Sequence, residues 1–225
     1  MEILKRSDIM RMAQAAAGKM GLAKTKARPH ELILALPLRA DEDTYTFSLN
    51  RESAEKVLPQ ITKGLEDRSA FIAIGAAVGI LPVPVISSKE YPTAAAIQYH
   101  PDGNVFNQAA TTTLTEKQAL ESLYYGKMTL KTNEGVRLDK MPMLHFRTVN
   151  QTQKTATTDN QFVGNEVKPL GAAVRFGGGD DNEVTISIKC SDKTDMIGNA
   201  SRNNYLVVRL VGTIIKGSTT KAFVN

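Results

Sequence analysis

The chain has 225 residues, of which 42% are hydrophobic and 23% charged, so it can bury a sizeable core and is not a mainly disordered polymer. The net charge of +5 is local: residues 1–28 hold seven bases and two acids, whereas the other 197 residues hold 21 of each. The composition predicts a short basic arm on a neutral body and argues against nucleic-acid binding over the whole surface.

The first 28 residues form the predicted arm. Ser7 can cap a helix over residues 8–20, whose apolar face is mostly alanine and methionine. The bases that could bind a partner or nucleic acid are Lys5, Arg6, Arg11, Lys19, Lys24, Lys26 and Arg28. Such an arm can neutralise packaged nucleic acid without reading its bases, and a solvated tail is the alternative interpretation.

Alternating and β-branched segments after the arm predict roughly eight main strands. Residues 31–38 and 44–49 flank an acidic turn and are expected to pair as antiparallel strands. Residues 70–81 form a long apolar segment, which indicates a buried strand. The other predicted strands are residues 127–132, 136–138, 143–146, 170–176, 183–189 and 205–216.

Two short helices are expected in the connections. The first spans residues 53–58 and is stopped by Pro59. The second lies within residues 114–126, where Thr115 and Gln118 have the spacing of a capping box and Gly126 stands where a left-handed C-terminal residue belongs.

These elements predict a mainly β fold. Many strands with no β-α-β rhythm favour an antiparallel eight-stranded jelly-roll barrel or sandwich, with short helices in the connections and an N-terminal helical arm. An immunoglobulin-like or fibronectin-like sandwich is the alternative, but such domains have about 100 residues. Since there is no central linker or repeat, we expect a basic N-terminal helix and arm, residues 1–28, and a single jelly-roll domain, residues 29–225.

Histidines that could serve as bases or metal ligands are few and dispersed. His30, His100 and His145 are too far apart in sequence for the paired metal motif of a cupin. A Gly-x-Ser-x-Gly nucleophile elbow is also missing from the sequence. The sequence therefore predicts no catalytic set and no enzyme activity.

Other candidate chemistry is also weak. Cys190 is the single cysteine, which excludes an intramolecular disulfide and a multi-cysteine zinc site. Asp180, Asp181 and Glu183 form the densest acidic cluster, for which a solvated turn is favoured over the metal site of a carboxylate-dependent enzyme. We expect no cofactor, no metal and no small-molecule substrate. The sequence also has no apolar run that predicts a membrane span or an export signal.

Several stretches carry a resemblance to a known family. They are residues 45–49 (YTFSL), 64–73 (GLEDRSAFIA), 99–106 (YHPDGNVF), 119–127 (ALESLYYGK) and 151–153 (QTQ). In order and spacing, over roughly residues 30–215, they resemble the jelly-roll capsid proteins of small tailless icosahedral phages.

That resemblance implies a major-capsid-like structural protein that self-assembles into an icosahedral shell without catalysis. It implies a place in the virion after synthesis in the host cytoplasm. The implied partners are copies of the chain and other virion proteins, with packaged nucleic acid as a candidate partner of the arm. The alternative is an accessory or minor virion protein that docks on a larger assembly or on nucleic acid through the arm.

Overall fold

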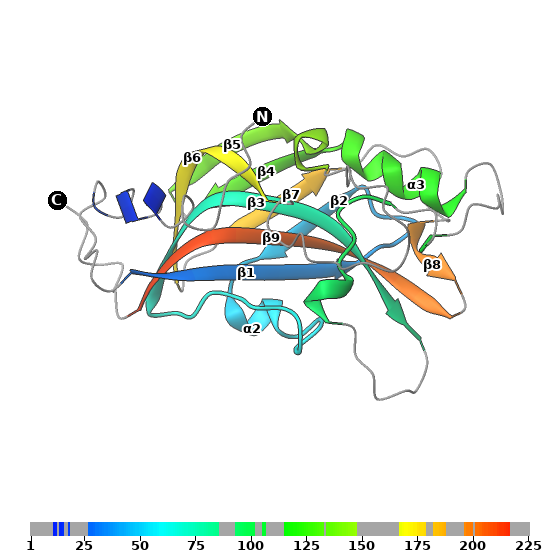
Figure 1. Cartoon of the computed structure of the whole chain (residues 1–225), viewed down its shortest axis with the longest axis horizontal. Helices are drawn as coiled ribbons and strands as arrows, with labels where there is room; N and C mark the ends of the chain where they lie inside the picture. The colour runs from blue at the N-terminus through cyan, green and yellow to red at the C-terminus, as the bar shows by residue number, and fades with distance from the viewer. Residues whose placement is uncertain are drawn as a thin grey trace.

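The computed structural model describes residues 11–12, 14–15, 18, 27–85, 93–101, 105–106, 115–132, 134–147, 167–178, 182–187, 196–199 and 201–216. These residues are mainly β and form two antiparallel sheets with a few short helices (Figure 1). Sheet 1 has the order β1 (Ala27–Pro37), β9 (Arg202–Lys216), β3 (Ser69–Pro84) and β6 (Lys168–Gly177), with the short β8 (Gly198–Asn199) beside β9. Sheet 2 has the order β2 (Thr44–Ser48), β7 (Glu183–Ser187), β4 (Lys127–Thr132) and β5 (Gly135–Pro142).

The eight longer strands pair in a nested order, in which each earlier pair encloses the next one along the chain. β1 pairs with β9, β2 with β7, β3 with β6 and β4 with β5, each antiparallel. The pairs β3–β9 and β4–β7 join this nest into the two sheets. The first half of the chain therefore pairs with the second half in reverse order.

The predicted hairpin of the first two strands is wrong. β1 lies in sheet 1 and β2 lies in sheet 2, so the acidic turn between them carries the chain from one sheet to the other. Both strands have apolar residues for a shared interior, such as Leu32 and Phe47, and local alternation does not specify which strand supplies the hydrogen bonds.

The arm boundary also changes. β1 begins at Ala27 rather than near residue 31, and Arg28 lies within it opposite Ile214. Pro29 is tolerated there because β1 is an edge strand of sheet 1. Of the predicted helix over residues 8–20, the structure describes residues 11, 12, 14, 15 and 18, all of them helical, and the rest lies outside the described residues.

The helices are short and lie in the connections: α2 (Arg51–Ala54), η2 (Ala94–Ala96), α3 (Glu116–Ser122), η3 (Leu123–Tyr125) and η4 (Met143–Phe146). The capping box is confirmed, since the Thr115 side chain accepts from the Gln118 backbone while the Gln118 side chain accepts from the Thr115 backbone. The helix predicted over residues 53–58 instead begins after Asn50, whose side chain accepts from the backbone N–H of Glu52 at 2.8 Å.

Two further local predictions are wrong. Gly126 is extended (φ −73°, ψ −172°) rather than left-handed, because the chain passes directly from η3 into β4. The predicted strand over residues 143–146 is a 3₁₀ turn. Met143 and Phe146 are its buried residues, and their spacing of three suits such a turn.

A hydrophobic core fills the space between the sheets, and a second apolar cluster lies on the outer face of sheet 1. β3 serves both. Phe71 and Ala73 face the inner core, but beyond the irregularity between Ala73 and Gly75 the inward residues are Ala76 and Val78. This change of parity is the signature of a β-bulge, and it keeps both faces of β3 apolar and buried.

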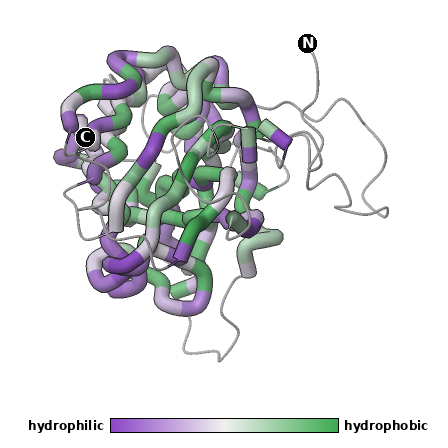
Figure 2. Tube along the Cα trace, turned by 90° about the vertical axis from the view of Figure 1, so that its left-hand side faces the viewer, coloured by the Kyte–Doolittle hydropathy of each residue, from purple (hydrophilic) through white to green (hydrophobic). Residues whose placement is uncertain are grey.

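Hydrophobic residues follow the inner strands, and hydrophilic ones the outer bends (Figure 2). On the outer face of sheet 1, residues 97–99 lie close against β3. Ile80 and Gln98 exchange two backbone hydrogen bonds, of 2.7 and 2.8 Å. A Cβ on Gly79 would meet the Ile97 side chain at 2.6 Å and the Gln98 carbonyl oxygen at 2.9 Å, so this approach requires glycine.

The body has two unlike ends. At the terminal end, β1 begins beside the last residues of β9, and the connections there are residues 49–68, 133–134 and 178–182. At the loop end, β1 finishes and β9 begins, and the connections there are residues 38–43, 85–126, 143–167 and 188–201, of which 85–126 and 143–167 are the longest in the body. The loop end, with α3 and β8, lies at the right of Figure 1.

Candidate functional site

The predicted arm bases are only partly described. Lys5, Arg6, Lys19, Lys24 and Lys26 lie outside the described residues. Arg11 is helical and exposed, and Arg28 is an exposed residue of β1. The basic segment ahead of the sheet is therefore residues 1–26, which we call the N-terminal segment.

Two of the three histidines, His30 and His145, lie at opposite ends of the fold. His30 is half-buried at the terminal end, with its ring edge-on to Phe71 at a centroid distance of 6.3 Å. Burial and the nearby Lys63 charge lower the pKa of His30. His145 lies in η4 at the loop end, where its Nε2 donates to the Pro169 carbonyl oxygen at 3.0 Å. These contacts anchor both imidazoles to the fold.

The acidic cluster and the cysteine are mostly outside the described residues. Asp180, Asp181 and Cys190 are not among them, and Glu183 forms an ion pair with Lys131 across β7 and β4 at 3.5 Å. Within the described part of the chain, no group of three His, Cys, Asp or Glu side chains is placed to hold a metal ion.

A buried polar cluster organises the loop end. Glu116, at the start of α3, accepts a hydrogen bond from Asn204 of β9 (2.8 Å) and forms an ion pair with Arg202. The Arg202 guanidinium also lies 5.3 Å from the centroid of Phe106 and donates to the Val105 carbonyl oxygen. This cluster connects α3, β9 and residues 105–106 although they are distant in sequence.

Asn204 extends the same network through its backbone. Its carbonyl oxygen accepts from the N–H of Leu38 at 2.9 Å, and its own N–H donates to Ile197 at 3.0 Å. Its side-chain amide also donates to the Met196 carbonyl oxygen at 3.1 Å. Because Asn204 is fully buried, it holds segments from three of the four loop-end connections in one arrangement.

The hydroxyls of two buried tyrosines also hold loop-end connections in place. The Tyr124 hydroxyl donates to the carbonyl oxygens of Tyr99 (2.9 Å) and Val78 (3.2 Å), and burial raises its pKa well above the ordinary value. The Tyr45 hydroxyl donates to the Arg39 carbonyl oxygen and accepts from the Arg39 N–H, which closes the acidic turn. The described parts of the loop end are thus preorganised by buried hydrogen bonds.

Among the described residues, three large apolar side chains are exposed at the loop end: Val85 (52%), directly after β3, and Tyr125 and Leu144 on two neighbouring turns. Tyr125 is 71% exposed at the end of η3, and Leu144 is 52% exposed in η4. The two turns pack against one another, and the Met143 N–H donates to the Gly126 carbonyl oxygen at 3.0 Å. We call Tyr125 and Leu144 the apolar pair. Rigidly presented aromatic and aliphatic side chains of this kind are typical anchors of protein interfaces.

Acidic groups lie near the apolar pair. The turn over residues 38–43 has three acids and one base, and Asp41 and Asp43 are exposed. The turn leads into β2 at Thr44. Thr44 and Lys127 both pair with Ser187 of β7, so β2 and β4 are two strand spacings apart, about 10 Å in total. Because Lys127 follows Tyr125 closely in the chain, the turn and the apolar pair are separated by about this distance. By sequence, the four loop-end connections together hold eleven acids and seven bases, a net charge of −4.

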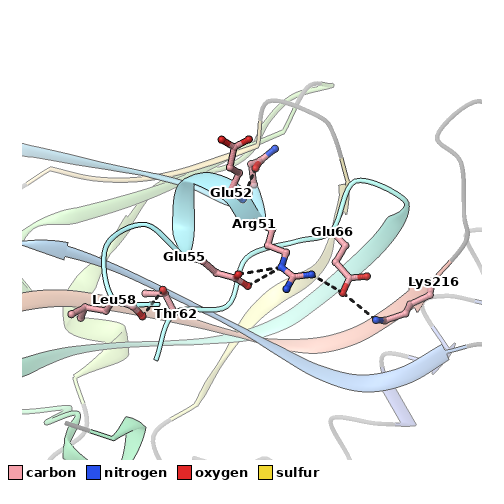
Figure 3. Close-up of polar contacts among 8 residues, drawn as sticks. Arg51, Glu52, Glu55, Leu58, Thr62, Glu66 and Lys216 are labelled. Atoms are coloured by element: carbon pink, nitrogen blue, oxygen red, sulfur yellow. Dashed lines mark hydrogen bonds and ion pairs between the residues drawn. The ribbon is translucent and has the colours of Figure 1, made fainter. Parts of the chain in front are cut away.

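The terminal end carries an exposed chain of ion pairs instead (Figure 3). Arg51 contacts Glu55 at 3.1 Å and Glu66 at 3.5 Å, and Glu66 contacts Lys216 at 3.1 Å. These pairs connect α2, the segment before β3 and the last residue of β9 at the surface.

The exposed edge of sheet 2 is unsuited to pairing with another strand. β5 has two register shifts against β4, and Lys140 within it has a positive φ of 50°. Arg137, Asp139 and Lys140 are all exposed along it. Bulges and charges on an edge strand oppose the addition of a strand from another chain.

Sequence reasoning did not find the Glu116–Arg202 pair or the apolar pair. An acid at the first position of a capped helix is common on a surface, because it favours the helix dipole. Tyr125 and Leu144 lie in segments predicted as helix end and strand. The run of two tyrosines before Gly126 was the available signal, but nothing local shows which tyrosine is buried.

Comparison with known proteins gives no match: the sequence fits no family model, and neither a curated protein nor a solved structure is significantly similar. In the described part of the chain, no helix combines the length and apolar character needed to cross a membrane.

Proposed function

We propose that this protein is a structural subunit of a virus shell, a jelly-roll capsid protein that self-assembles into an icosahedral phage capsid and has no catalytic role. The observation that carries the proposal is the nested strand pairing. An eight-stranded chain whose first half pairs with its second half in reverse order, folded into two four-strand layers, has the order of a jelly roll.

The jelly roll also occurs in lectins and cupins, so the surface must distinguish among these functions. A cupin holds its metal with histidines inside the barrel, but here His30 and His145 lie at opposite ends of the body. A carbohydrate-binding platform relies on several exposed aromatic rings, whereas among the described residues Tyr125 is the single exposed one, in a sequence with no tryptophan. The preorganised loop end with its exposed apolar pair instead suits association between proteins.

The sequence resemblance supports the same function. The stretches that carry it include residues 64–73 and 119–127, which in the structure are the start of β3 and the passage from α3 into β4. These segments supply core residues such as Phe71 and Tyr124, so the resemblance concerns residues that build the fold.

The proposal is tested by the assembly state of the purified, nuclease-treated full chain. We expect sedimentation velocity and electron microscopy to show closed shells of uniform diameter or their regular ring intermediates, over some range of salt and protein concentration. A chain that stays monomeric at high concentration in every salt condition would overturn the proposal. An accessory role would be indicated if ordered particles form only with another virion protein.

A further inference from the structure

We propose that the N-terminal segment of one copy docks on the loop end of a neighbouring copy, so that subunits associate head to tail. This deepens the proposed function and rests on it, because it names the contact through which copies of the shell subunit meet. The occupant of the apolar pair is then residues 1–26 of a second copy.

Charge complementarity is the first argument. Residues 1–26 hold six bases and two acids, a net charge of +4, whereas the loop-end connections have a net charge of −4. The remaining residues hold 15 bases and ten acids, a net charge of +5, so the loop end is the acidic part of the chain and the basic segment is not attracted by the rest of the body. Potentials of opposite sign steer association and oppose wrong orientations.

Apolar complementarity is the second argument. The predicted helix of the N-terminal segment has Ile9, Met12, Ala16 and Met20 on one face. Met12 is 45% exposed, so its own body leaves that part of the face open. An amphipathic helix of this kind matches a surface that presents exposed Tyr125 and Leu144 about 10 Å from an exposed acidic turn.

The placement of the two surfaces favours an intermolecular contact. The segment joins the body at Ala27, at the terminal end, and its described helical residues lie at that end, at the left of Figure 1. β1 separates the two ends by about 36 Å. A helix over residues 8–20 is about 20 Å long and the six residues 21–26 span at most about 20 Å, so the segment is long enough to extend from the terminal end onto a neighbour's loop end.

A contact between two different surfaces of the same chain is heterologous. Such a contact propagates, and it closes into rings or shells when the rotation between copies allows closure. This suits a shell subunit, whereas a contact between identical patches would end at a dimer.

The experiment uses two full-length variants that each disable one surface. The double variant Y125D/L144D disrupts the apolar pair at the loop end, which we call the acceptor surface. The double variant I9D/M12D disrupts the apolar face of the N-terminal segment, which we call the donor segment. V136D is the matched control, because Val136 is also exposed (56%) but lies at the terminal end. Circular dichroism and thermal unfolding would establish that all variants fold.

In sedimentation velocity we expect each disabled variant alone to lose self-association by at least about tenfold in dissociation constant, while V136D assembles like the wild type. An equimolar mixture of the two disabled variants retains one intact donor and one intact acceptor, so it should form a one-to-one dimer and nothing larger. Association should weaken as salt increases.

A mixture that sediments no faster than its components would overturn the inference, as would normal assembly of either variant alone. If closed shells form and the variants leave them unchanged, this contact is wrong while the proposed function stands. If the contact yields only open chains, the contact stands and the shell function fails. If the donor variant loses only nucleic-acid binding, the segment binds nucleic acid instead and the inference fails.

Discussion

Arginine–glutamate pairs hold both ends of the body together, but in opposite environments. At the loop end, the side chains of Glu116 and Arg202 are 7% and 19% exposed, whereas at the terminal end those of Arg51 and Glu66 are 56% and 41% exposed. Breaking a buried pair leaves a charge without its partner in low dielectric, and breaking an exposed pair lets water replace the partner. The same chemistry should therefore stabilise the fold at one end and contribute little at the other.

The difference suits the roles proposed for the two ends, in which the loop end binds the N-terminal segment that a neighbouring copy extends from its terminal end. The loop end presents the apolar pair from connections that are long in sequence, and buried hydrogen bonds around Asn204 and Tyr124 hold the described parts of them. The terminal end has three connections, two of them short (133–134 and 178–182), and gives rise to the N-terminal segment. A rigid acceptor surface reduces the entropy lost on binding.

The largest effect is expected from E116Q. The substitution keeps the shape of the side chain but leaves Arg202 without its counter-charge, which should cost about 3 kcal/mol of unfolding free energy. For a chain of this size, the melting temperature should fall by roughly 10 °C. Chemical denaturation measures the free energy directly, and an unchanged midpoint would show that the pair is solvated.

The next effect is expected from Y124F. The hydroxyl is buried, and its loss leaves the carbonyl oxygens of Tyr99 and Val78 without that donor. We expect a loss of about 1–2 kcal/mol in unfolding free energy. Y125F is the matched control, because the neighbouring tyrosine is exposed and its hydroxyl should contribute almost nothing. Equal losses in the two variants would contradict the assignment.

The pH dependence of stability tests the terminal end. Because the folded-state pKa of His30 is lowered, the unfolded chain takes up a proton below about pH 6.5 that the folded chain does not. His30 should therefore reduce stability as pH falls from about 6.5 through its folded pKa, and the contribution should be absent above that window. H30Q should show a shallower loss of stability between pH 7 and pH 5 than the wild type. Parallel curves for the two proteins would refute this role.

The smallest effect is expected from E66Q, the counterpart of E116Q at the exposed end. It removes the acceptor shared by Arg51 and Lys216, and we expect a change of less than about 0.5 kcal/mol that decreases further in high salt. Denaturation at low and high salt measures it. A loss as large as that of E116Q would mean that exposure does not distinguish the two ends.

Local sequence patterns predicted much of the secondary structure and little of the pairing. The strand over residues 127–132 and the Thr115–Gln118 capping box are confirmed, because both depend on residues a few positions apart. The expected pairing of β1 with β2 is wrong because strand partners are chosen by packing of the whole chain. The 3₁₀ turn at residues 143–146 was missed because four residues cannot distinguish periods of two and three.

By itself, the sequence determined that the chain is mainly β, that its excess positive charge lies ahead of the sheet, and where most strands begin and end. These properties follow from composition, alternation and turn residues, which act over short distances. Only the tertiary structure decided that β1 pairs with β9, that Glu116 meets an arginine 86 residues away, and that Tyr125 and Leu144 are exposed together. Those outcomes depend on which segments bury each other, and that is a property of the assembled fold.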